Sequence, residues 1–425
     1  MDVSRSRFLA ALGMLGAIGA SGTSAAAALP PWFPLPPPLK PKAPKRALVL
    51  SGAGARGAYE AGALKWLFKD IDANGPPYDL ICGTSAGAIN TVFAACASST
   101  LIAQVGQMWL DMPQANVLQL VPPAQHAVNA GEAFRESSEH GFPRKFSYLS
   151  RANRELKAMG PKEDLAKVLG VVSSDGINTL VRKYPLTLAA MKTSLIVTAT
   201  NMTRFSSDAF YHFSGPGGDR QQANFLHRGS IESASGGSSL RFSGGQFALT
   251  EDNLVKTVLA SAAVPGVFQP VDVPISETGA TDTFVDGGVA NNTPVSTAVS
   301  TGATDVTVLI ASAAGEGMEK PPSTLPGLLQ GSFSVIQREL LENDIKMALA
   351  RNVLSRYRDY TGLSASTTAY LRGIQAQEWE PVTLRIIRPQ APLKLTAMGF
   401  NDGPDLQAAF DEGYADAQRA VTYLV

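Results

Sequence analysis

The chain has few of the residues that build disulfide frameworks or metal centres. Its 425 residues include 2 cysteines and 4 histidines, and the last histidine is His227. The cysteines, Cys82 and Cys96, are expected to be small buried apolar side chains rather than a disulfide pair. No cluster of His, Cys, Asp or Glu has the spacing of metal ligands, so we predict neither a metal nor another cofactor.

The chain also lacks an excess of charge of either sign. It has 36 basic and 36 acidic residues, and 45% of its residues are hydrophobic. This balance argues against nucleic acid as a partner, and the apolar content suffices for a large core. Beyond the N-terminal region no stretch is long and apolar enough to cross a membrane, so any membrane contact of the mature chain should be peripheral.

The N-terminal region has the composition of an export signal. In residues 1–28, Arg5 and Arg7 precede a short apolar run over 8–20, and small residues follow. We therefore expect a chain exported to the periplasm, the cell envelope or the exterior of a bacterium. An uncleaved N-terminal membrane anchor is the alternative. Residues 29–45 are rich in proline and are expected to form an extended linker.

An apolar run that ends in Gly-x-Ser-x-Gly is the strongest chemical signal in the chain. Residues 78–82 read Tyr-Asp-Leu-Ile-Cys, then Gly83-Thr-Ser85-Ala-Gly87 opens a segment of small apolar residues typical of a helix. A nucleophilic serine must leave its strand on a sharp turn, and flanking glycines keep that turn free of side chains. We therefore predict that Ser85 is a nucleophile at the N-terminus of a helix, where partial positive charge favours a developing anion.

A second apolar run, residues 46–50, ends in a glycine-rich loop. The loop reads Gly52-Ala-Gly-Ala-Arg-Gly57, which also fits the fingerprint of dinucleotide-binding proteins. That fingerprint requires an acidic residue at the end of the next strand, to hold a ribose. Here the serine turn occupies that strand end. We therefore favour a loop whose backbone N–H groups bind an oxyanion.

The histidines give little support for a histidine base. The chain order of α/β-hydrolases requires a late histidine, and none follows His227. An earlier one, His212 or His227 with Asp164 as partner, is an alternative without a supporting motif. The better base is Asp286, which follows a short apolar strand and precedes a tight turn through Gly287. A carboxylate hydrogen-bonded to the serine can take its proton if the site tunes the carboxyl pKa.

The glycine loop, the serine turn and the Asp286-Gly-Gly turn, in this order, resemble the motifs of the patatin-like phospholipase family. Residues 260–270 resemble that family's segment ahead of the aspartate, and the resemblance spans 46–312. It implies a three-layer α/β/α hydrolase domain with a mainly parallel central sheet, acting without a cofactor on a lipid or membrane-surface substrate. It also implies a Ser85–Asp286 dyad. The resemblance assigns the oxyanion hole to Gly52, Ala53 and Gly54, and supporting roles to Arg56, Gly57, Gly83, Gly87 and Gly287.

Ala53 departs from the three consecutive glycines that are usual in this family. An alanine keeps its N–H but does not adopt positive φ cheaply. An inactive module that binds lipid or a protein partner is therefore the alternative to an ester hydrolase. Arg56 is expected to order its own loop through a carboxylate, and contact with an anionic substrate is the second reading.

The rest of the chain is expected to complete the same domain. Residues 194–200 and 305–311 read as buried strands. Residues 313–425 are predicted to be a C-terminal helical extension packed on the domain, with a late strand at 382–387 and a closing helix over 406–424.

One stretch of the predicted domain, residues 142–157, is locally basic and aromatic. Such a stretch is usually the solvated face of a helix. Contact with an anionic lipid surface is the alternative.

Overall fold

The computed structural model describes residues 45–139, 144–159, 169–214, 222, 244–276, 279–317, 325–355, 380–419 and 421–423. The predicted export signal, and the predicted linker except Lys45, lie outside these ranges. So do Asp164, His140 and His227. Within the described residues, no helix combines the length and apolar character needed to span a bilayer.

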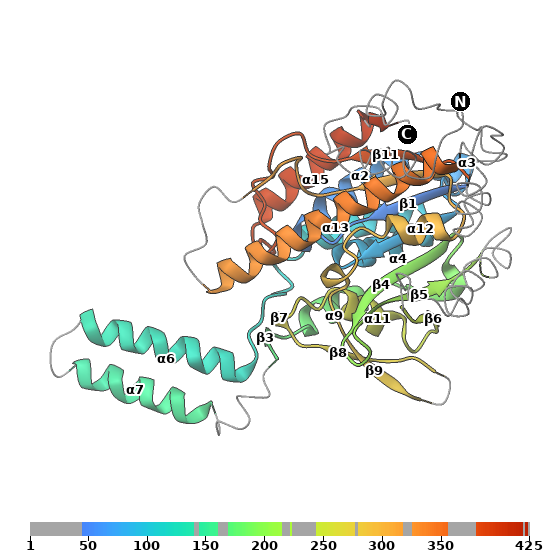
Figure 1. Cartoon of the computed structure of the whole chain (residues 1–425). Helices are drawn as coiled ribbons and strands as arrows, with labels where there is room; N and C mark the ends of the chain where they lie inside the picture. The colour runs from blue at the N-terminus through green and yellow to red at the C-terminus, as the bar shows by residue number, and fades with distance from the viewer. Residues whose placement is uncertain are drawn as a thin grey trace, which may run out of the picture.

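A mixed sheet forms the centre of the molecule (Figure 1). Its parallel strands are β1 (Arg46–Leu50), β2 (Leu80–Thr84), β4 (Ser194–Asn201), β10 (Asp305–Leu309) and β11 (Thr383–Ile387). The remaining strands are β5 (Ser206–His212), β6 (Gln246–Ala248), β8 (Val271–Pro274), β9 (Thr281–Val285) and β12 (Val421–Tyr423). The order is β12-β11-β10-β1-β2-β4-β5-β6, and β9 pairs with β4 and β8. The carboxyl ends of β1 and β2 therefore lie side by side, which brings the glycine loop to the serine turn.

Helices cover both faces of this sheet because its central strands are apolar on both sides. In β1, Leu48 and Leu50 pack into one core, and Ala47 and Val49 pack into a second core on the other face. The first core is covered by α2 (Gly57–Leu67), α4 (Ala86–Ala95), α5 (Ser99–Leu110), α9 (Asp175–Val181), α11 (Leu254–Ser261) and α15 (Gly403–Gln418). The second is covered by α12 (Val295–Ser300) and α13 (Leu325–Ser355). The predicted three-layer α/β/α fold is confirmed.

Short helices and a small second sheet fill the connections. They are α3 (Ile71–Asn74), η2 (Gly54–Arg56), η3 (Leu188–Ala190) and η4 (Gly287–Val289), with β3 (Gly170–Val172) paired to β7 (Gly266–Phe268). The two cysteines are free and buried, as predicted. Burial raises the pKa of the Cys96 thiol to about 11, so this thiol stays protonated at neutral pH.

The C-terminal segment contributes strands to the central sheet as well as helices. The predicted strand is β11, which extends the parallel sheet beside β10. The predicted closing helix over 406–424 is wrong at its end, because α15 stops at Gln418 and residues 421–423 form β12, antiparallel to β11. These last residues read Val-Thr-Tyr, which are strand formers, and the free edge of β11 supplies their hydrogen-bond partners.

Two helices form an antiparallel pair that projects from the body of the molecule. They are α6 (Pro122–Glu139) and α7 (Arg144–Ala158), and Figure 1 shows them extending away from the three layers. The basic stretch at 142–157 belongs mostly to α7. We refer to this pair as the helical arm.

Candidate active site

Ser85 lies on a sharp turn between a strand and a helix. β2 ends at Thr84 and α4 begins at Ala86, and Ser85 between them has φ 56° and ψ −123°. A serine with positive φ is strained and persists only where the surroundings hold it. A side chain at Gly83 would collide with the carbonyl oxygen of Gly87, so the two glycines permit the helix to start directly over the strand.

A second serine holds the backbone of this turn. The N–H of Ser85 donates to Ser261 Oγ at 2.8 Å, and Ser261 Oγ donates to the carbonyl of Thr198 at 2.6 Å. Ser261 is buried and belongs to α11. The strained residue is therefore tied to α11 and β4, and sequence reasoning assigned no role to Ser261.

Asp286 reaches the same edge of the sheet from β9. The Thr200 hydroxyl on β4 donates to the carbonyl of Asp286 at 2.9 Å. Thr198, two residues earlier on β4, is the register partner of Thr84 on β2. A Cβ atom added to Gly287 would lie 2.8 Å from the Thr84 side chain. The turn after Asp286 therefore lies against the end of the strand that carries Ser85.

Burial controls the charge of Asp286. The side chain is buried, and this raises the pKa of its carboxyl to about 7. The Ser85 hydroxyl and the Gly288 N–H oppose that rise, and the Gly288 N–H donates to Oδ1 at 2.6 Å. Oδ2 accepts no hydrogen bond from the described residues. The structure thus brings the two predicted catalytic residues together.

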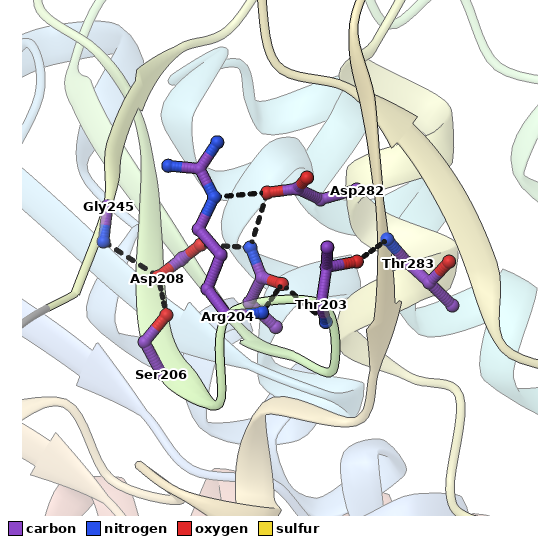
Figure 2. Close-up of polar contacts among 8 residues, drawn as sticks. Thr203, Arg204, Ser206, Asp208, Gly245, Asp282 and Thr283 are labelled. Carbon is purple, nitrogen blue, oxygen red and sulfur yellow. Dashed lines mark hydrogen bonds and ion pairs between the residues drawn. The ribbon is translucent and has the colours of Figure 1, made fainter.

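A buried polar cluster fixes β9, the strand that leads to Asp286 (Figure 2). The Asn201 side-chain amide donates to Asp208 Oδ2 at 2.7 Å and to Asp282 Oδ2 at 2.8 Å. Arg204 pairs with Asp282 at 2.6 Å. Asp208 also accepts from the Ser206 hydroxyl and from the Gly245 N–H. The turn between β4 and β5 is therefore clamped to β9, four residues before Asp286.

The glycine loop supplies two unengaged N–H groups beside Ser85. Neither the N–H of Ala53 nor that of Gly54 has a hydrogen-bond partner in the described part of the chain. Gly52 was predicted to be a third donor, and this is wrong because its N–H donates to the carbonyl of Asn292 at 2.9 Å. Gly52 instead permits close approach, since a Cβ atom there would lie 3.2 Å from Ser85 Cβ.

The backbone of this loop accommodates Ala53. Ala53 has φ −144°, a value that any residue adopts, whereas Gly54 has φ 58°. The conformation that requires glycine is therefore at position 54, where a side chain would also collide with the carbonyl of Ala397. Ala53, the residue that favoured an inactive module, is therefore compatible with the loop.

A segment from the C-terminal part of the chain closes the loop. The N–H of Ala55 donates to the carbonyl of Ala397 at 2.8 Å, and Arg56 Nε donates to the carbonyl of Leu395 at 2.7 Å. Arg56 Nη2 also pairs with Glu316 at 2.7 Å. These contacts fit the expectation that Arg56 orders its own loop.

A buried hydrogen-bond network joins the loop to α4 and α5. Asn90 on α4 donates to Glu60 Oε2 at 3.0 Å and accepts from Trp109 Nε1 at 2.7 Å. The Ser51 hydroxyl donates to Glu60 Oε1 at 3.3 Å. Burial raises the pKa of Glu60 to about 8, so this residue is mainly neutral at pH 7. A side chain at Gly57 would collide with the Trp109 indole, which explains the glycine there.

An apolar pocket opens beside Ser85. The space not filled by protein atoms there is about 370 Å³, a volume that includes the open solvent at its mouth. Its lining residues are Gly54, Ser85, Ala86, Ile89, Trp109, Met112, Ile177, Ala262, Val264, Phe268, Met398 and Phe400. Apart from the Ser85 hydroxyl and the loop backbone, this surface is suited to hydrocarbon. Met398 and Phe400 come from the C-terminal part, which the sequence did not connect to the site.

Neither described histidine lies near Ser85. His212 pairs with Leu195, which lies beside Ile81 near the start of β2, whereas Ser85 follows the other end of that strand. The separation along the strand is about 13 Å at roughly 3.3 Å per residue. His126 is in the helical arm, where it contacts Glu155. The histidine alternative through His212 is therefore wrong.

No group of three His, Cys, Asp or Glu side chains converges among the described residues in a way that could hold a metal ion. The site consists of a hydroxyl, a carboxyl, backbone N–H groups and an apolar pocket. This donor set suits acyl transfer without a metal.

The fold and site together define a serine-hydrolase-like α/β protein. The model of the family described as patatin-like phospholipase matches residues 48–299, so the chain belongs to the patatin-like phospholipase family. Membership in this family supports a lipid hydrolase. A search of curated proteins found no match.

Three solved structures show distant similarity. VipD from Legionella pneumophila is 13% identical, with 91% of this chain and 71% of that chain covered and a TM-score of 0.31. Human GIVD cytosolic phospholipase A2 is 11% identical, with 98% of this chain and 66% of that chain covered and a TM-score of 0.29. ExoU from Pseudomonas aeruginosa, solved in complex with SpcU, is 14% identical, with 87% of this chain and 70% of that chain covered and a TM-score of 0.21.

Proposed function

We propose that this protein hydrolyses ester bonds of lipids, including phospholipids, through a Ser85–Asp286 dyad and an acyl-enzyme intermediate. The observation that carries the proposal is the placement of Ser85. It lies on a strained turn, faces an apolar pocket, and is next to a buried carboxyl whose pKa is raised to about 7. A base with a pKa near the working pH combines a useful ionised fraction with a useful proton affinity.

The first half-reaction forms the acyl-enzyme. Asp286 takes the proton of Ser85 Oγ as this oxygen attacks the ester carbonyl, and the oxyanion accepts hydrogen bonds from the N–H groups of Ala53 and Gly54. The intermediate collapses, the bond to the alcohol oxygen breaks, and the alcohol leaves with the proton from Asp286. The fatty acyl chain lies in the apolar pocket.

The second half-reaction releases the acid. Asp286 takes a proton from water, the hydroxide attacks the acyl carbon, and the same two N–H groups bind the new oxyanion. The bond to Ser85 Oγ breaks, and the proton returns from Asp286 to that oxygen. The products are a fatty acid and the free enzyme.

Two substitutions test the roles of the dyad. Ser85→Ala removes the nucleophile, and Asp286→Asn keeps the shape of the base but cannot take the proton. We expect each to lower hydrolysis of a phospholipid and of a soluble ester by at least about 10³-fold. Circular dichroism and thermal unfolding would show that both variants are folded. Turnover close to wild type in either folded variant would refute the mechanism.

The composition of residues 1–28 supports export as the cellular setting of this activity. Under this proposal the enzyme acts in the periplasm, in the cell envelope or outside the cell. Fractionation of cells that express the full chain, with and without residues 2–28, tests it. Equal retention of both forms inside the cell would contradict the proposal.

A further inference from the structure

The helical arm is packed through small side chains, which leaves larger ones on its outside. Ala130 and Ala133 of α6 and Ala152 of α7 are buried between the helices. Among the arm residues whose burial is described, no large apolar side chain is buried. The arm therefore holds together without using its larger apolar residues.

Three of the four exposed large apolar residues of the arm lie on one side of it, and the fourth, Val128, lies elsewhere on α6. Phe134 on α6 is 47% exposed, and Leu149 and Leu156 on α7 are 37% and 44% exposed. Leu149 and Leu156 are two helical turns apart and share a face. At 100° per residue, each of the three is rotated in the same sense from the buried side of its own helix, by about 40–70°. In an antiparallel pair this rotation places all three on the same side.

The charge that the arm presents to solvent is positive. Three of its four acidic side chains are engaged, since Glu136 pairs with Arg151, Glu139 with Arg135 and Glu155 with His126. Across the described residues, the basic side chains of the arm without an ion-pair partner are Arg144, Arg154 and Lys157, against one acidic side chain, Glu132. An exposed apolar face on a pair of helices with an excess of unpaired basic residues complements the interface of an anionic bilayer.

The base of the arm lies next to the pocket beside Ser85, because Val172 pairs with Phe268, which lines that pocket. The chain entering α6 and the chain leaving α7 pair at Leu120 and Val172, and the Val121 N–H donates to the Val171 carbonyl at 3.0 Å. Just beyond these two segments, Met112 and Ile177 line the apolar pocket. The arm is therefore anchored to the body of the molecule close to the pocket.

We propose that the helical arm is a membrane-docking surface, with Phe134, Leu149 and Leu156 in the bilayer interface and the basic residues of α7 on anionic head groups. Docking there would present lipid to the pocket at the base of the arm. This docking proposal rests on the proposed function in one respect, that the substrate is a lipid. Vesicle binding can be measured without turnover, so the two proposals can be tested separately.

The test measures vesicle binding in the full chain carrying Ser85→Ala. The probes are vesicles of phosphatidylcholine alone and of equal parts phosphatidylcholine and phosphatidylglycerol, assayed by co-sedimentation. The arm variant is Phe134→Ser with Leu149→Ser and Leu156→Ser. The matched control is Val335→Ser with Ile336→Ser and Met347→Ser, three α13 residues that are 62%, 46% and 64% exposed. All chains are identical at their N-termini, so any contribution from that region is common to them.

We expect the arm variant to bind phosphatidylglycerol vesicles at least tenfold more weakly than the control. A charge variant, Arg154→Glu with Lys157→Glu, should weaken this binding at least threefold while binding to phosphatidylcholine vesicles changes little. In chains with Ser85 intact, the arm variant should hydrolyse a soluble ester at the wild-type rate but vesicle lipid at least tenfold more slowly. The soluble-ester rate also shows that the variant is folded.

Equal vesicle binding by the arm variant and the control would overturn the proposal, whether because neither loses affinity or because both lose it equally. Wild-type affinity of the charge variant for phosphatidylglycerol vesicles would overturn its electrostatic part. Vesicle binding that depends on the arm, in a chain that hydrolyses no ester, would instead refute the proposed function and leave the docking surface in place.

Discussion

Gly54→Ala is the substitution that most sharply tests how the oxyanion loop is built. Gly54 has φ 58°, and a Cβ atom there would run into the carbonyl of Ala397. The left-handed conformation costs an alanine about 1–2 kcal/mol. Because the clash is with backbone, the loop must also shift, and this moves the Gly54 N–H away from the oxyanion. Loss of one such donor costs about 3 kcal/mol in the transition state.

The expected result for Gly54→Ala is a kcat on a soluble ester at least 100-fold below wild type, in a protein that unfolds a few degrees lower. Ala53→Gly is the matched control, because Ala53 at φ −144° is unstrained. It should keep kcat within about threefold and lower stability by no more than ~1 kcal/mol, through the added freedom of the unfolded chain.

Steady-state kinetics and thermal unfolding of both variants decide between the outcomes. A Gly54→Ala enzyme with near-wild-type kcat would refute the assignment of that N–H to the oxyanion. An Ala53→Gly enzyme that is many times faster than wild type would show that Ala53 does impair the loop.

Three further predictions follow from the buried polar groups. The base must be ionised, and the pKa of Asp286 is raised to about 7, so kcat/KM should fall about tenfold as the pH drops from 8 to 6; a flat profile over that range would count against Asp286 as base. Ser261→Ala leaves the Ser85 N–H and the Thr198 carbonyl without their partner, so the free energy of unfolding should drop by ~1–3 kcal/mol, and kcat should fall as well; denaturant unfolding with unchanged stability would contradict this role. Burial raises the pKa of Glu60 to about 8 in the folded protein. The protonated carboxyl therefore contributes its full share of the free energy of unfolding at a pH below the pKa that Glu60 has in the unfolded chain. This contribution is lost as the pH rises toward 8. Relative to Glu60→Gln, wild type should therefore lose on the order of 4 kcal/mol between pH 4 and pH 9, at about 1.4 kcal/mol per pKa unit, and parallel stability curves for the two proteins would contradict the buried neutral carboxyl.

The parts of the site that could be predicted from the sequence are those encoded in a few consecutive residues. The turn around Ser85 requires glycines on both sides and small residues after it, and these requirements leave a readable pattern. The strands were readable for a similar reason, because β1, β2 and β4 are apolar on both faces. The pattern of apolar residues and the residues of the turns were thus sufficient to predict the central sheet and the position of the nucleophile.

The parts that could not be predicted depend on contacts between distant segments. Nothing local to Arg56 indicates that its Nε bonds to Leu395, 339 residues away. The engagement of the Gly52 N–H by Asn292 is equally non-local, and it removed one expected oxyanion donor. The sequence also left open which residue of the loop has positive φ, because it did not show that the carbonyl of Ala397 approaches position 54.

The central claim is that Ser85 is an activated nucleophile with Asp286 as its base. The most direct measurement is the labelling rate of the folded full chain by a fluorophosphonate, with the adduct mapped by peptide mass spectrometry. We predict an adduct on Ser85 in wild type, none in Ser85→Ala, and labelling slowed at least 100-fold in Asp286→Asn. Absence of an adduct in folded wild-type protein, or equal labelling rates in wild type and Asp286→Asn, would contradict the account.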